Sequence, residues 1–102
     1  MRNFLKRFPN HYLEIQEGHQ WLLQFGDQYR LSIINHKGSR GYPNLYEIGV
    51  FSDCDTMAAL PGITEQDDQV KGHLTPNEVD VIILKMIAIT GKRPVSVLPP
   101  NL

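Results

Sequence analysis

Residues 76–90 carry the clearest pattern of apolar and polar positions in the chain. Their apolar side chains recur at spacings of three and four residues, which is the repeat of one face of an α-helix. The members of this stripe are Val79, Ile82, Ile83, Met86 and Thr90. We therefore expect one long helix near the C-terminus, packed on the rest of the protein by this stripe.

The residues at both ends of this segment are those that start and stop helices. Thr75 precedes the segment as an N-cap, and Glu78, three residues later, completes a capping box. Pro76 occupies the first helical position, where the missing N–H of proline has no intrahelical partner to lose. Gly91 follows the last turn and marks the usual kind of helix end. Local sequence therefore predicts both helix boundaries.

The same helix carries a second apolar stripe, formed by Val81, Leu84 and Ala88, at about 100° or more from the first. A small domain needs only one apolar stripe to dock a helix. Each large aliphatic side chain left in water forgoes roughly 1.5–3 kcal/mol of burial. We expect a second copy of the chain to cover this stripe in a homodimer, because two-fold pairing is the commonest closed assembly. The alternative cover is the chain's own N-terminal segment or its C-terminal tail.

Upstream of the helix the pattern is that of β-strands. Residues 20–25 and 29–36 are rich in β-branched and aromatic side chains, and the Gly-Asp pair between them predicts a hairpin. Shorter runs at residues 11–18 and 44–51 predict two further strands. The expected fold class is α+β, with a small antiparallel β-sheet of about four strands packed against one long C-terminal helix.

The remaining segments are predicted to be loops and a tail. Residues 37–44, KGSRGYPN, form a turn-rich loop, and residues 52–72 show no sustained period. A connection as long as the second is often functional or mobile, and we expect it to run over the surface. A chain of 102 residues holds one core, so residues 1–94 are assigned to a single domain and residues 95–102 to a Pro-rich C-terminal arm.

Charge and cysteine content bear on partners and compartment. Ten basic and eleven acidic side chains give a net charge of −1, so no overall field attracts nucleic acid or an anionic membrane. The single cysteine, Cys54, fits a reducing compartment. No stretch approaches the roughly 20 apolar residues that span a bilayer, and the N-terminus lacks the apolar run of a signal peptide. We expect a cytoplasmic protein.

The sequence contains no pattern typical of a catalytic or metal site. Zinc sites usually show at least one pair of ligands two or four residues apart, and the histidines form no such pair. The acids between residues 53 and 68 lack the spacing of a calcium loop. Neither Cys54 nor any serine lies in a nucleophile motif. We therefore expect no enzymatic activity, no cofactor and no metal. The histidines are His11, His19, His36 and His73.

Two other groups of residues are candidates for binding. In the loop at 37–44, glycines allow a backbone nest for an anion, with Lys37, Ser39, Arg40 and Tyr42 as contacts. A phosphate loop is normally followed by a helix, whereas a strand follows here, so the alternative is an ordinary hairpin loop with solvated charges. A second group consists of acids that suit a basic patch on a partner. These acids are Glu65, Asp67 and Asp68.

Two blocks of the sequence stand out together, namely YRLSIINHKGSRGYPNLYEIGVF, residues 29–51, and GHLTPNEVDVIILKMI, residues 72–87. They resemble a group of short phage and prophage proteins of unassigned function. Arg40 stands where a tyrosine is usual, and His73 replaces an aromatic residue. The matching positions are Leu31, Ser32, Ile33, Gly38, Ser39, Gly41, Leu45, Tyr46, Glu47, Gly72, Leu74, Thr75, Glu78 and Val79.

This resemblance implies a phage-encoded accessory protein that acts in the cytoplasm of a bacterial host. Small phage proteins of this kind commonly bind and block a host or defence component. The leading hypothesis is therefore a non-enzymatic binding protein that modulates or inhibits a host or defence protein by protein–protein contact. The alternatives are a small-ligand sponge for a nucleotide or similar anion, and a nucleic-acid-binding regulator. For the regulator, aromatic side chains on the strands would stack on bases. Those aromatic residues are Trp21, Phe25, Tyr29, Tyr42 and Tyr46.

Overall fold

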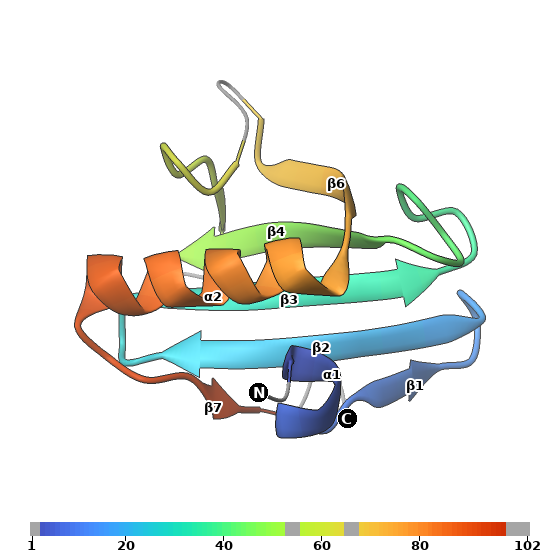
Figure 1. The fold of residues 1–102 in the computed structure, drawn as a ribbon, viewed down its shortest axis with the longest axis horizontal. Helices are drawn as coiled ribbons and strands as arrows, with labels where there is room; N and C mark the ends of the chain where they lie inside the picture. The colour runs from blue at the N-terminus through green and yellow to red at the C-terminus, as the bar shows by residue number, and fades with distance from the viewer. Residues whose placement is uncertain (1–2, 53–55, 65–67, 98–102) are drawn as a thin grey trace.

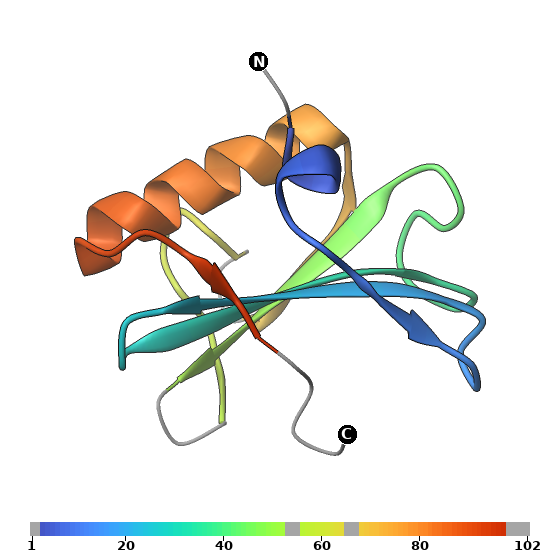
Figure 2. The ribbon, with the colours of Figure 1, turned by 90° about the horizontal axis from the view of Figure 1, so that it is seen from below.

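The computed structural model describes residues 3–52, 56–64 and 68–97 and shows an antiparallel sheet with helices on one face (Figures 1 and 2). Three long strands form the centre of the sheet, namely β2 (Gly18–Phe25), β3 (Tyr29–His36) and β4 (Tyr46–Ser52). Four short strands complete its two sides, namely β1 (His11–Leu13), β5 (Met57–Ala58), β6 (Val70–Leu74) and β7 (Val95–Ser96). The α+β class is confirmed.

The predicted hairpin is present as β2 and β3. Its register pairs Trp21 with Ile33 and Leu23 with Leu31, so that apolar side chains on neighbouring strands share one face. These side chains belong to the core with the buried residues of α2, and the helices lie over this side of the sheet (Figure 2). The alternation of apolar and polar positions therefore fixes which side of the hairpin is buried.

Helix α2 (Pro76–Thr90) begins and ends where its caps predict. Oγ1 of Thr75 accepts a hydrogen bond from the N–H of Glu78 at 3.2 Å, and Oε1 of Glu78 accepts one from the N–H of Thr75 at 3.0 Å. Gly91 adopts the left-handed conformation, with φ of 69°, and its N–H donates to the carbonyl of Ile87. The capping bonds at both ends therefore come from residues next to the helix in sequence.

The core lies between α2 and the sheet, and a second, short helix, α1 (Phe4–Arg7), closes it near the N-terminal end of α2 (Figure 2). The inward residues of α2 are those of the predicted first stripe, and all five are buried. From the sheet and the connections, the core receives Trp21, Leu23, Phe25, Leu31, Ile33, Ile48, Val50, Ile63 and Leu74.

The prediction of about four strands was too low, since the described residues form seven. Strands β5 and β6 lie within or overlap residues 52–72, which we expected to be a surface excursion. Ile63, from the same segment, is 1% exposed and belongs to the core. Strands of two to five residues give too little alternation to be recognised, and pairing with β4 decides their conformation.

Two other segments, residues 11–18 and residues 95 and 96, also differ from the expected pattern. The predicted strand at 11–18 is divided by a turn, in which Glu17 has a positive φ of 58° and Ile15 is 94% exposed. Residues 95 and 96, assigned from the sequence to a C-terminal arm, pair with Gln24 and Leu23 of β2. None of the described helices is long and apolar enough to cross a membrane.

Candidate functional site

The outer face of α2 exposes the predicted second apolar stripe. Val81 is 50% exposed, Leu84 is 61% exposed, and Ala88 is also exposed. On the opposite side of the helix, Val79 and Met86 are fully buried in the core. A single helix thus presents one apolar face to the sheet and a second to solvent. Figure 1 shows α2 in front of the sheet.

Neither chain end, as far as the structure describes it, covers this outer stripe. Helix α1 turns its buried Phe4 toward the aromatic rings of Trp21 and Tyr46, with ring centroids 5.1 and 5.2 Å away. The C-terminal segment runs from α2 to the edge of β2, where the N–H of Val97 donates to the carbonyl of Leu22. The outer stripe is therefore a free surface within residues 3–97 as described.

The stripe is flanked by a shallow hollow of about 170 Å³ between α2, β6 and the turn at Gly62. Val81, Ile82 and Leu74 supply its apolar wall. Nζ of Lys85 donates to the carbonyl of Gly62 at 3.0 Å and closes one side. The outer face of α2 therefore combines an apolar stripe with an ammonium group at its margin.

Glu78 adds a carboxylate to the same flank of α2. Hydrogen bonds from the backbone N–H and side chain of Thr75 hold the pKa of Glu78 below its ordinary value, and nearby Lys71 contributes in the same direction. The group is therefore ionised at neutral pH and gives this flank of α2 a negative charge one helical turn before Val81.

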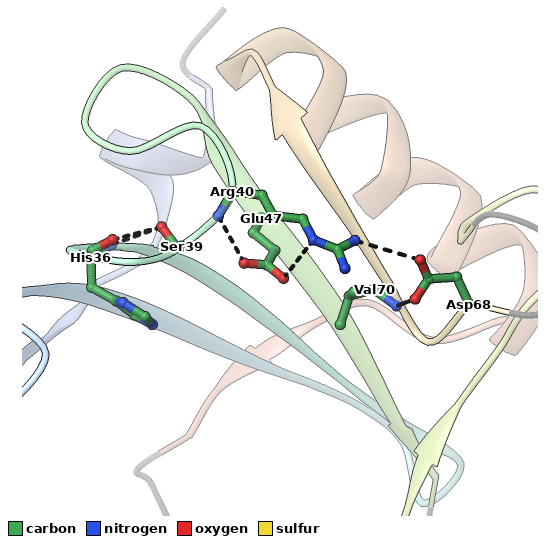
Figure 3. Close-up of polar contacts among 6 residues, drawn as sticks. All are labelled: His36, Ser39, Arg40, Glu47, Asp68 and Val70. Atoms are coloured by element: carbon green, nitrogen blue, oxygen red, sulfur yellow. Dashed lines mark hydrogen bonds and ion pairs between the residues drawn. The ribbon is translucent and has the colours of Figure 1, made fainter.

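Both cations of the predicted anion-binding loop at residues 37–44 lie near carboxylates, and Figure 3 shows the carboxylates beside Arg40. Nε of Arg40 lies 3.9 Å from Oε2 of Glu47, and its Nη1 lies 3.5 Å from Oδ2 of Asp68. Nζ of Lys37 lies 3.3 Å from Oε2 of Glu17. An incoming anion would therefore meet three carboxylates already placed beside these two cations.

The polar groups of this loop are also engaged in its own turn. Oγ of Ser39 donates to the carbonyl of His36 at 2.8 Å and accepts from the N–H of His36 at 3.1 Å. The N–H of Arg40 donates to Oε1 of Glu47, and the N–H of Tyr42 donates to the carbonyl of Ser39. The side chain of Tyr42 is exposed, and only its backbone takes part in these bonds. The loop thus uses its donors internally.

Asp68 joins the loop to β6 instead of standing free on the surface. Hydrogen bonding from the N–H of Val70 is the main reason that the pKa of Asp68 lies below its ordinary value, and Arg40 adds to it. The N–H of His73 donates to the carbonyl of Arg40 at 3.3 Å. The two sequence blocks at 29–51 and 72–87 therefore meet here. Glu65 and Asp67, the other predicted interface acids, lie outside the described residues.

The face of the sheet opposite α2 carries a hollow of about 260 Å³ that the sequence pattern did not predict. It arises because the register pairs Ser32 with Gly49, which places two small residues side by side. Nε2 of Gln20 donates to Oγ of Ser32 at 2.9 Å on its floor, and Phe51 and Glu47 belong to its lining. Only the β-sheet register could have revealed this hollow.

Two further predictions concern aromatic and metal-binding residues. Trp21 and Phe25, candidates for stacking on bases, are buried in the core and 4% and 0% exposed. Across the described parts of the chain, the acidic, histidine and cysteine side chains form no group that could hold a metal ion.

No protein-family model, no curated protein and no solved structure matches this chain. The resemblance to short phage and prophage proteins therefore stays a prediction. The proposal on function below therefore depends mainly on the geometry of the molecule.

Proposed function

We propose that this chain is a non-enzymatic binding protein that acts by direct contact with a bacterial host or defence protein, through the outer face of α2. The observation that carries the proposal is the exposure of Val81, Leu84 and Ala88 on a helix that already has a buried stripe. The class of partner rests on the resemblance of residues 29–51 and 72–87 to phage and prophage proteins.

The outer stripe adds little to the core of this chain, which is why a contact function is favoured. Val81 and Leu84 are at least half exposed, so they contribute little of the burial that stabilises the domain. Exposed aliphatic side chains grouped on one surface and rimmed by polar groups are typical of protein–protein contact sites. Lys85 and Glu78 provide such a polar rim on one side.

The small-ligand alternative is less favoured by the geometry of the loop at 37–44. Its two cations each lie beside carboxylates, and Ser39 uses its hydroxyl within the turn. A thermal-shift titration with nucleotides and inorganic phosphate separates the two functions, because a ligand that binds the folded state raises the melting temperature. We expect no shift. A shift that disappears in Arg40→Ala would favour the sponge.

Site-specific photocrosslinking tests the proposed contact surface. A photoreactive amino acid in place of Leu84 should give a crosslinked product with one bacterial protein in host lysate. The same group in place of Gln28, an exposed residue of the β2–β3 turn, is the matched control and should give none. Addition of excess unlabelled Leu84→Glu should not compete with the crosslink, whereas excess wild type should. Equal crosslinking from both positions would contradict the proposal.

A further inference from the structure

We infer that the outer face of α2 also fits a second copy of this chain, with the two helices packed antiparallel about a two-fold axis. This inference rests on the proposed function only in treating that face as a protein-contact surface. It names the molecule that occupies this face and gives the orientation and register of the two helices. It also implies that pairing and binding of another protein compete for the same face.

The spacing of the exposed stripe supports helix–helix packing. Asn77, Val81, Leu84 and Ala88 recur at intervals of four, three and four residues, which is the repeat of a coiled-coil seam. All four are exposed, so the seam is open along most of the helix. An antiparallel alignment that sets Val81 of one copy against Leu84 of the other also sets Asn77 against Ala88. Two-fold symmetry repeats each contact.

The charges beside the seam are self-complementary in the same alignment. Glu78 and Lys85 lie seven residues apart on one flank, next to Val81 and Leu84 respectively. Antiparallel pairing brings that flank of one helix against the same flank of the other in reverse order. Glu78 of each copy then lies beside Lys85 of the other, twice by symmetry. Antiparallel helix dipoles add to this attraction.

Lys85 is available for such a pair. Within the described residues Nζ of Lys85 donates to the carbonyl of Gly62 and forms no ion pair with a carboxylate. Glu78 accepts hydrogen bonds from Thr75 through its capping box, and a carboxylate can accept further bonds on its remaining lone pairs. The ion pair therefore requires no loss of the cap.

The size of the seam determines how strongly the two copies are expected to associate. A standard stable interface buries about 800 Å² on each partner. Three aliphatic side chains with a polar rim fall at the low end of this scale. We therefore expect a weak dimer that dissociates on dilution, not an obligate one.

Sedimentation equilibrium over a wide concentration range tests the pairing. Wild type should shift from monomer to dimer as concentration rises. Leu84→Glu and Lys85→Glu should each raise the dissociation constant at least about tenfold, the first by placing charge in the seam and the second by facing Glu78 with another carboxylate. Gln28→Glu, an exposed change away from α2, is the matched control and should leave it unaltered.

A charge-reversal mixture tests the register. Glu78→Lys alone and Lys85→Glu alone should each be monomeric, whereas an equimolar mixture should form a heterodimer, because each of the two contacts then again joins one lysine and one glutamate. Circular dichroism checks that each variant remains folded. Failure of the mixture to associate would overturn the register.

The outcomes also separate this inference from the proposed function. A wild type that stays monomeric at every concentration, or a dimer unaffected by both single substitutions, would overturn pairing through α2. Neither result would alter the photocrosslinking test at residue 84 against host lysate. A dimer without any host crosslink would support the pairing and contradict the proposed function.

Discussion

The backbone N–H of Phe4 donates a hydrogen bond to Oδ1 of Asp80 at 2.8 Å, and this bond joins α1 to α2 across 76 residues of sequence. It holds Phe4, which is fully buried, in an edge-on contact with the rings of Trp21 and Tyr46. The N-terminal segment is therefore part of the folded core, because one carboxylate on α2 fixes its position over the aromatic side chains.

Asp80→Ala should destabilise the protein by about 1–2 kcal/mol, because it removes the charged acceptor and leaves a partly buried N–H without a partner. The measurement is urea unfolding followed by tryptophan fluorescence, which reports on Trp21. Asp80→Asn keeps an acceptor oxygen and should cost less. Gln28→Ala, an exposed change in the β2–β3 turn, is the control. If all three variants unfold alike, α1 is not held by this bond.

The capping carboxylate of Glu78 should make helix stability depend on pH. Its pKa in the folded state lies below the ordinary value because the N–H of Thr75 bonds to it. Between the folded-state pKa and the ordinary pKa, the unfolded state therefore binds more protons than the folded state. The stabilisation is complete above the ordinary carboxylate pKa and is lost as pH falls through the lower folded-state value. The difference in melting temperature between wild type and Glu78→Gln should shrink between pH 7 and pH 3. A constant difference would show that the carboxylate's charge does not stabilise the cap.

Helix α2 and the β2–β3 hairpin could be predicted because their signals are local. Thr75, Glu78 and Gly91 mark the ends of the helix within its own sequence. The hairpin has eight residues in each strand, which is enough for the alternation of faces to be recognised. In both cases the conformational preferences of the local sequence agree with the final fold.

The short strands and the ion pairs could not be predicted because distant residues determine them. Strand β7 has two residues and exists because β2 offers it a free edge. The ion pair of Arg40 with Asp68 joins residues 28 positions apart, which the pairing of β6 with β4 brings together. A sequence pattern reports which side chains are charged, and the sheet register decides which of them meet.

Gly72→Ala should destabilise the protein by about 1–3 kcal/mol, as overpacking usually does. A Cβ at this position would overlap with Cβ of Arg40, which is too close to the backbone to move away freely. Thermal and urea unfolding measure the effect. Arg40→Gly should recover part of the loss in the double variant, because it removes the atom that clashes. If the two substitutions are simply additive, the loop at 37–44 does not pack on Gly72 in solution.

The two apolar stripes of α2 should differ sharply in what they contribute to folding. Met86 is fully buried in the core, so Met86→Ala leaves a cavity and should cost about 2–5 kcal/mol. Leu84 is 61% exposed, and alanine is the better helix former, so Leu84→Ala should change the stability by less than about 0.5 kcal/mol. Urea unfolding at low protein concentration keeps any dimer dissociated. If Leu84→Ala proved as costly as Met86→Ala, the chain itself would cover the outer stripe. A near-zero cost leaves Leu84 free to serve contact with another molecule, because its apolar surface then has no part in holding the monomer together.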